Sequence, residues 1–260
     1  MSADPAIAVL LVLSGPAIGS FLGVLADRLP RGQDVIRAGS ACRGCGQRLG
    51  WRDLIPILSY LNARGRCRHC GGAIPPWLLY SELAATGLAG VAVWLGGSGA
   101  EMLLAALWLW LLLALALSDL IWFRLPDVLT GGVLATALAL SLVTGWPPPG
   151  AALIGAALGS GSFLAIRWAY AALRGREGLG LGDVKLMAGL GAALGWQALP
   201  LMLLMAALGT LGAAGVAALR GARGIGGATP LPFGAALCGA AGLLWVLMRA
   251  GGIGPGLAAF

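Results

Sequence analysis

Two aspartates are the residues of this apolar chain best suited to catalysis. Asp119 lies in LLLALALSDLIWFRLPD, about one turn before the end of an apolar run, and Asp183 lies in GLGLGDVKL. A carboxylate facing lipid costs about 2.5 to 3.5 kcal/mol, so we expect Asp119 to face the interior of a helix bundle. Two carboxylates held close together in a partly dry site cannot both ionise easily and can share a proton. The ionised member can then activate a water molecule while the protonated member polarises a carbonyl, which is the chemistry of aspartic proteolysis.

The residues around Asp183 support this interpretation. Gly180 and Gly182 remove side chains just before it, so that a backbone or a substrate can approach closely. Lys185 has two possible roles, to steady an ionised Asp183 or to meet lipid headgroups, and the sequence favours neither. Asp127 follows a proline at the start of a predicted helix, where capping and a function at the site are equally good explanations. Capping is also the alternative role for Asp183.

Four cysteines form a second candidate site, in CRGC (Cys42 and Cys45) and CRHC (Cys67 and Cys70), with 21 residues between the inner two. Four thiolates at this spacing can close a tetrahedral zinc site. Disulfides or free thiols are the alternatives, but lasting disulfides are rare in a reducing compartment.

The two remaining residues of these types have simpler explanations. His69, the only histidine, lies inside the second cysteine motif and is expected to be a solvated turn residue, so no serine–histidine or cysteine–histidine pair competes for catalysis. Cys238 lies in an apolar run and is expected to be a small buried hydrophobe.

The composition defines the setting of both sites. Hydrophobic residues make up 59% of the 260 and charged residues 10%, with a mean hydropathy of +0.89, which indicates an integral membrane protein. The net charge of +7 does not indicate nucleic-acid binding, because the basic residues are mostly arginines between apolar runs without interleaved aromatics. Their pattern is typical of membrane orientation, and the expected partner is the lipid bilayer.

The apolar runs predict an all-α polytopic protein with about eight transmembrane helices and a small cytoplasmic zinc-knuckle loop. Glycine and proline mark the turns between the runs. The predicted spans are residues 5–25, 78–97, 101–122, 127–145, 149–173, 184–194, 197–219 and 231–250.

Charge predicts the orientation. No lysine or arginine precedes the first run, so we expect a retained helix rather than a secretory signal. Nine of the seventeen basic residues follow it, between Arg28 and Arg68, which places that loop in the cytoplasm and the N-terminus outside. Eight spans then place both aspartates on the cytoplasmic side and leave only Arg249 in disagreement. The other basic residues that this places in the cytoplasm are Arg124, Arg174, Arg176, Lys185, Arg220 and Arg223.

At these residues the chain resembles the type IV prepilin peptidases, bifunctional leader peptidases and N-methyltransferases of the bacterial inner membrane. The resemblance runs nearly from end to end and departs from the family's pattern in the N-terminal half, at Gly23, Leu54 and residues 77–79. The matching stretches are GSFLGVLADRLP, the two CxxC motifs flanking IPILSYL, SDLIWFRLPDVLT, GREGLGLGDVKLMAGLGA and TPLPFGAAL.

The resemblance implies a function and a division of the chain. Asp119 and Asp183 correspond to the family's catalytic aspartates, and GLGD to its GxGD motif. Such enzymes cleave after the glycine that ends the leader of type IV prepilins or pseudopilins, which serve pili or secretion, and then methylate the new N-terminus with S-adenosylmethionine. We therefore expect a first helix over 1–26, a methyltransferase-associated loop domain over 27–77 and a peptidase domain over 78–260.

Two other classes of function remain open from the sequence. A proton-coupled transporter would use the same acids as a proton relay, but it predicts acids spread through the depth of the membrane, whereas these cluster at one face. A membrane-anchored zinc ribbon that only binds a partner would account for the cysteines and leave Asp119 without a role.

Overall fold

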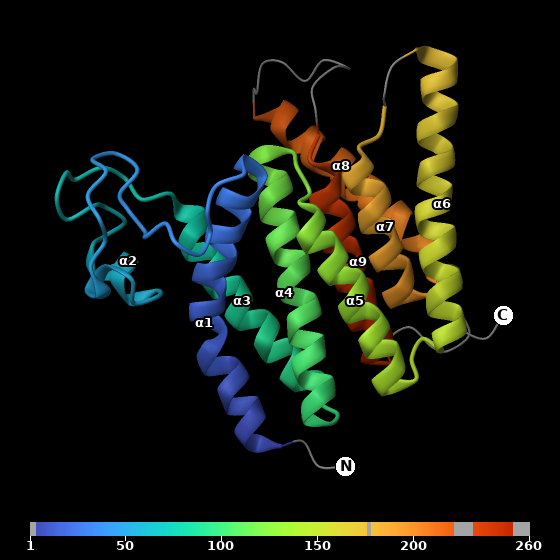
Figure 1. Ribbon diagram of the computed structural model, residues 1–260, viewed down its shortest axis with the longest axis horizontal. Helices are drawn as coiled ribbons and strands as arrows, with labels where there is room; N and C mark the ends of the chain where they lie inside the picture. Colours follow the sequence, from blue (N-terminus) through green and yellow to red (C-terminus); the bar gives the residue numbers. More distant parts are fainter. Residues whose placement is uncertain (1–3, 176–177, 221–230, 252–260) are drawn as a thin grey trace. The chain divides into compact units, whose positions relative to one another are not determined.

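The computed structural model describes residues 4–175, 178–220 and 231–251, and in these ranges the chain is helical, with only two isolated β-bridges (Figure 1). It divides into two compact units, Met1–Ala106 and Leu107–Phe260. Its α-helices are α1 (Pro5–Arg28), α2 (Leu58–Asn62), α3 (Pro76–Leu95), α4 (Gly99–Trp122), α5 (Asp127–Thr144), α6 (Pro149–Arg174), α7 (Leu181–Leu194), α8 (Leu199–Leu219) and α9 (Phe233–Arg249). Short 3₁₀ turns occupy Leu29–Arg31, Trp51–Asp53 and Trp196–Ala198.

Capping residues, prolines and glycines define several helix ends, which lie within about three residues of the predicted bounds. Asp4 caps α1, because its carboxylate accepts a hydrogen bond from the N–H of Ala6 at 3.0 Å. Proline is the first residue of α3 and α6, a position at which a backbone N–H would have no partner within the helix. Gly145 and Gly175 end α5 and α6 in the left-handed conformation, with φ of 69° and 65°.

In the first unit, α1 and α3 meet along a stripe of glycines. Gly15, Gly19 and Gly23 recur every four residues and therefore lie on one face of α1. A Cβ at Gly19 would stand 2.5 Å from the Cα of Glu82, so the backbones touch directly. This is the small-residue packing expected of helices in lipid, where close backbone approach replaces the hydrophobic effect.

In the second unit, α6 and α7 cross in the same way, side by side in Figure 1. A Cβ at Gly155 of α6 would collide with the carbonyl of Gly191 in α7, and one at Gly159 would lie 2.5 Å from the carbonyl oxygen of Met187. On its other side α7 packs against α5, where Gly189 meets Val133. Helix α7 is thus held between two neighbours, which fixes the position of its first turn.

All eight apolar runs predicted from the sequence form helices, and the all-α membrane architecture is confirmed. By length and composition, six helices in the described ranges are suited to crossing a membrane: α1, α3, α4, α5, α6 and α8. Helix α9 is apolar but has 17 residues, and α7 has 14, so the count of eight spans stays a prediction. Arg176, Arg223 and the first two residues of TPLPFGAAL lie outside the described residues.

The α6–α7 crossing gives a test of the packing. Gly155→Ala should lower the thermal midpoint of the protein in detergent, because the added methyl group meets backbone and overpacking typically costs about 1 to 3 kcal/mol. Gly161→Ala, on the same helix with nothing within 4 Å of its Cβ, should leave the midpoint unchanged or higher. Equal midpoints for the two variants would contradict the close crossing.

Candidate functional site

Asp119 lies in the last turn of α4, and only 6% of it is exposed. Its Oδ2 accepts a hydrogen bond from the N–H of Ala235 at 2.8 Å, and the N–H of Gly234 also donates to this carboxylate. Both donors belong to the first turn of α9, where backbone N–H groups have no partner within the helix. A Cβ at Gly234 would lie 3.1 Å from Asp119 Cγ, so glycine leaves the space that the carboxylate occupies.

Asp183 is the third residue of α7, and Gly180 is the N-cap of this helix. The carboxylate reaches back and accepts the N–H of Gly180, which is one half of a capping box. The sequence offered Asp183 as the N-cap itself, but Gly180 holds that position, and Asp183 supports the cap from the third residue of the helix. This role does not remove the residue from the site, since Asp183 lies close enough to Asp119 for the two carboxylates to repel each other electrostatically.

Leu125, from the turn between α4 and α5, packs against a glycine beside each aspartate. A Cβ at Gly182 would stand 2.9 Å from Leu125 Cβ, and one at Gly234 would stand 3.0 Å from Leu125 Cδ1. The residue before Asp183 and the residue that holds Asp119 thus pack on one side chain. Cys238 is buried, as expected, and its thiol interacts electrostatically with both carboxylates, a proximity that its apolar surroundings in the sequence did not indicate.

The glycines before Asp183 have a structural explanation besides substrate access. A Cβ at Gly178 would meet the ring of Tyr170, 2.5 Å from Cδ1, and the guanidinium of Arg167 donates to the carbonyl of Leu179. Both of these side chains come from α6. At Gly180 a Cβ would lie 3.2 Å from Asp183 Oδ2, so the loop follows α6 and leaves the carboxylate room.

Lys185 has a partner that neither sequence hypothesis named. Its Nζ lies 2.7 Å from Oδ2 of Asp127, the first residue of α5, and both side chains are largely exposed. The pair joins the start of α7 to the start of α5. Exposed pairs of this kind contribute little to stability.

The four cysteines come together, as predicted, in two similar turns of the first unit. The N–H of Cys42 donates to Gln47, and that of Cys67 to Gly72. Each turn ends in a short antiparallel bridge. The four sulfur atoms lie within 4.8 Å of one another.

The sulfur geometry fits a zinc ion. Zn–S bonds of about 2.3 Å in a tetrahedron place the sulfurs about 3.8 Å apart, and the Sγ atoms of Cys42 and Cys70 are separated by 3.8 Å. The N–H groups of Cys45 and Gly44 lower the pKa of Cys42 to about 6, which favours the thiolate that a metal requires. His69 is exposed and is not one of the four clustered ligands, as expected.

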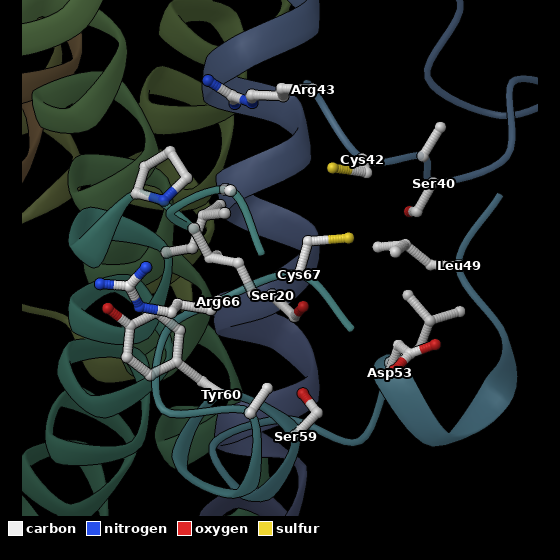
Figure 2. A pocket seen from close by; sticks show the side chains of 18 of the residues that line it. Ser20, Ser40, Cys42, Arg43, Leu49, Asp53, Ser59, Tyr60, Arg66 and Cys67 are labelled. Atoms are coloured by element: carbon white, nitrogen blue, oxygen red, sulfur yellow. The ribbon is translucent and has the colours of Figure 1, made fainter. Parts of the chain in front are cut away.

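A cavity of about 400 Å³ lies in the first unit, between α1, the start of α3 and the cysteine loop (Figure 2). Figure 2 shows Ser20 on α1, Cys42 and Cys67 from the two turns, and Tyr60 and Asp53 from the segment between them. Several positions at which the sequence departs from the prepilin peptidase pattern line this cavity, namely Gly23, Leu54, Leu78 and Leu79. The departures are thus gathered around one site.

Two acids at this cavity were not singled out by the sequence. Asp27 is buried, and its Oδ2 receives Arg31 at 2.6 Å and Arg43 at 2.9 Å. Glu82 is also buried, six residues after the start of α3. Glu82 lies near the start of a predicted span, and Asp27 lies where the first apolar run meets the loop. An acid at either position needs no special role, so the sequence did not indicate that they line a cavity.

Comparison with known proteins agrees with the two-part structure. The sequence model of the bacterial peptidase A24 N-terminal domain matches residues 13–95, and that of the type IV leader peptidase family matches residues 106–216. The first match contains the cysteine loop, and the second contains both aspartates.

Curated relatives match over most of their length. The chain is 40% identical to a prepilin leader peptidase/N-methyltransferase of Klebsiella pneumoniae over 203 residues, which cover 76% of this chain and 89% of the relative. It is 36% identical to a protein of the same name from Aeromonas salmonicida, over 91% of this chain and 90% of the relative. A third, from Pseudomonas putida, is 34% identical over 94% and 93%. No solved structure matches the chain.

The cysteine cluster predicts a metal content. Purified protein should carry about one zinc ion per chain by elemental analysis, because the four sulfurs have the spacing of a tetrahedral site. Cys42→Ser should reduce the zinc to background, whereas Cys238→Ser, which alters a cysteine outside the cluster, should retain it. Equal zinc content in the two variants would exclude the site.

Proposed function

The chain belongs to the type IV leader peptidase family, and on this basis we propose that it cleaves the leader from type IV prepilins or pseudopilins with Asp119 and Asp183. The observation that supports the proposal is the proximity of these two carboxylates, 64 residues apart in the sequence: Gly182, beside Asp183, and Gly234, which donates to Asp119, both pack on Leu125, and the two charges repel each other. Cleavage falls after the glycine that ends the leader, and the two carboxylates act on the carbonyl of that residue.

The backbone donors support a division of the two roles. Asp119 accepts two N–H groups at the start of α9, where the helix dipole also stabilises a negative charge. Asp183 accepts one N–H and faces the charge of Asp119. Asp119 is therefore the ionised member and the general base, and Asp183 holds the shared proton.

The reaction follows from these roles. Asp119 takes a proton from a water molecule, whose oxygen attacks the carbonyl carbon, while Asp183 donates its proton to the carbonyl oxygen. The C–N bond then breaks as the leaving amine takes the proton from Asp119, and the carbonyl reforms as its proton returns to Asp183. Gly180 leaves room for the carboxylate of Asp183, Gly182 lets α7 approach Leu125, and the Lys185–Asp127 pair joins the starts of α7 and α5.

The membrane side follows from the arginine-rich loop. The positive-inside rule places residues 28–68 in the cytoplasm of a bacterial inner-membrane protein with its N-terminus outside. Helices α1, α3 and α4 then bring the end of α4, with Asp119, to the same side. A prepilin leader, which is cytoplasmic in this family, meets the pair there.

Methyl transfer is the second activity that we propose, and we assign it to the first unit. S-adenosylmethionine supplies a methyl group on a positively charged sulfur, which the new N-terminal amine accepts. The cysteine loop, whose four thiolates would hold zinc, forms one side of the cavity of about 400 Å³. This volume lies within the range of about 300 to 1,000 Å³ of small-molecule pockets.

A transporter is a poorer account of the same acids. Proton relays place acids at interrupted helices near the midplane of the membrane. Asp119 lies three residues before the end of α4, and Asp183 two residues after the start of α7. Two helix-end carboxylates sharing one site suit hydrolysis better.

The aspartates give the direct test of cleavage. Asp119→Asn and Asp183→Asn should each lower the rate of leader cleavage by about 10²- to 10⁴-fold, because each removes a proton-transfer group. The assay incubates purified full-length variants with a prepilin and follows the shortened product by mass. Asp34→Asn, which changes an exposed loop acid in the other unit, is the matched control and should cleave normally. Normal cleavage by either aspartate variant would refute the proposal.

A further inference from the structure

The loop between α1 and α3 exposes a group of large apolar side chains. Trp51, Ile55, Leu58 and Leu61 are between 39% and 72% exposed, and we call these four residues the tip patch. Trp51 belongs to the 3₁₀ turn Trp51–Asp53, which packs against α2, the helix that carries the two leucines. Clusters of exposed apolar side chains are found where a protein contacts a partner or a membrane.

The segment that carries the tip patch has two faces. Leu58 and Leu61 are three residues apart in α2 and therefore lie on the same side of this helix. Tyr60 and Ala63, also three residues apart, line the cavity of the first unit, whereas no residue of the tip patch does. The tip patch is therefore the outer face of the segment, away from the cavity.

A hydrogen bond fixes the position of this segment along the helices. The N–H of Ile57, between Ile55 and Leu58 in the chain, donates to Oε2 of Glu82 at 2.6 Å. Glu82 is six residues after the start of α3, which is about 9 Å along the helix axis. Its Cα also meets Gly19, nine residues and about 14 Å before the end of α1. The segment thus lies alongside the helices, and Figure 1 shows α2 to the side of α1 rather than beyond its C-terminal end.

The backbone of the segment is held in this place and has partners for its polar groups. Ile57 has a φ of 61°, a value that a β-branched residue rarely adopts and that persists only where the surrounding structure imposes it. The hydroxyl of Ser20 on α1 also donates to Glu82, so this carboxylate connects the segment to both helices. Three further N–H groups bond within the segment, namely those of Leu58, Ser59 and Leu61. Such internal pairing is what a lipid environment requires, because acyl chains offer no hydrogen-bond partner.

The level of Glu82 on α3 corresponds to the boundary of the bilayer. Helix α3 has 20 residues, the number that a hydrocarbon core of about 30 Å requires, so a point about 9 Å from its start lies inside this boundary. Interfacial helices bury their apolar face to a similar depth, about 5 to 10 Å. Tyr80, two residues before Glu82, is exposed on α3, and aromatic side chains are enriched at this boundary.

The composition of the segment suits the same boundary. The guanidinium of Arg52 lies over the ring of Trp51, 5.1 Å from its centroid. Tryptophan prefers the headgroup level of a membrane, and arginine there places its charge among the phosphate groups while its stem covers apolar surface. The aliphatic side chains of the tip patch then belong on the side of the acyl chains.

We propose that the tip patch inserts into the lipid leaflet on the side of the arginine-rich loop, which the topology proposed above makes the cytoplasmic leaflet. Acyl chains cover Ile55, Leu58 and Leu61, and phosphate headgroups meet Arg52. The loop that the sequence presents as the one soluble piece of the chain is thereby fixed to the membrane surface. An apolar segment of a substrate also fits such a face, but lipid is the constant neighbour at this depth. The proposal depends on neither enzymatic activity.

Photo-crosslinking from single positions tests the proposal. p-Benzoylphenylalanine is placed at Leu58 in one variant and at Leu61 in another, and each full-length protein is reconstituted in nanodiscs of phosphatidylethanolamine and phosphatidylglycerol. After irradiation, mass spectrometry should find lipid adducts at both positions. The same amino acid at Ile36 is the matched control and should give no lipid adduct. Ile36 is an exposed apolar residue of the same loop, but Arg28 holds its neighbours at the end of α1 through their carbonyls.

A second measurement needs no crosslinker. The difference in fluorescence between the wild type and Trp51→Phe gives the signal of Trp51, which is exposed, so that its replacement disturbs no packing. Lipids brominated near the headgroup end of their acyl chains should quench this signal. Lipids brominated near the terminal methyl group should leave most of it.

The outcomes decide between lipid and the other occupants. Lipid adducts at Leu58 and Leu61 but not at Ile36, with quenching by the shallow bromines, support the proposal. Equal yields of lipid adduct at all three positions, or a Trp51 signal that neither brominated lipid changes, would overturn it. A prepilin added before irradiation identifies a substrate surface: if the adducts at Leu58 contain prepilin and never lipid, the proposal also fails.

Discussion

Backbone N–H groups hold three carboxylates of this chain, those of Asp119, Asp183 and Glu82, and the proposed chemistry depends on that arrangement. Asp119 receives N–H groups from the start of α9, Asp183 from the N-cap of α7, and Glu82 from Ile57 in the loop between α1 and α3. In a chain with 10% charged residues, few cations are at hand to compensate a buried acid. Neutral donors fix each carboxylate in place, and at the aspartate pair they leave the charge for a water molecule or a partner acid.

Glycine makes these contacts possible at two levels. Glycines at helix crossings let α1 meet α3 and α6 meet α7 at backbone distance, which positions the helix ends. Glycines beside the carboxylates, such as Gly234 and Gly180, leave the space that the acids occupy. Each of the three glycines in GLGLGD therefore allows one close contact: Gly178 with the ring of Tyr170, Gly180 with Asp183 and Gly182 with Leu125.

The sequence predicted the parts that depend on local pattern. Apolar runs bounded by glycine and proline became helices, and the paired CxxC spacing became a cluster of four sulfurs. What it missed depends on contacts across long separations. Ala235 lies 116 residues from Asp119, and Lys185 lies 58 residues from Asp127. Hydrogen bonds from backbone N–H groups and exposed ion pairs between such distant residues produce no local sequence pattern from which they could be predicted. The stripe of Gly15, Gly19 and Gly23 is visible, but its partner on α3 is not.

The most direct measurement is the mass of the products when the purified wild-type protein meets a full-length prepilin, with and without S-adenosylmethionine. The account predicts that both mixtures contain the released leader ending in glycine, and that only the mixture with the donor contains a mature pilin heavier by one methyl group. A prepilin that stays intact, or one cut at another position, would contradict the assignment of Asp119 and Asp183 as a peptidase pair.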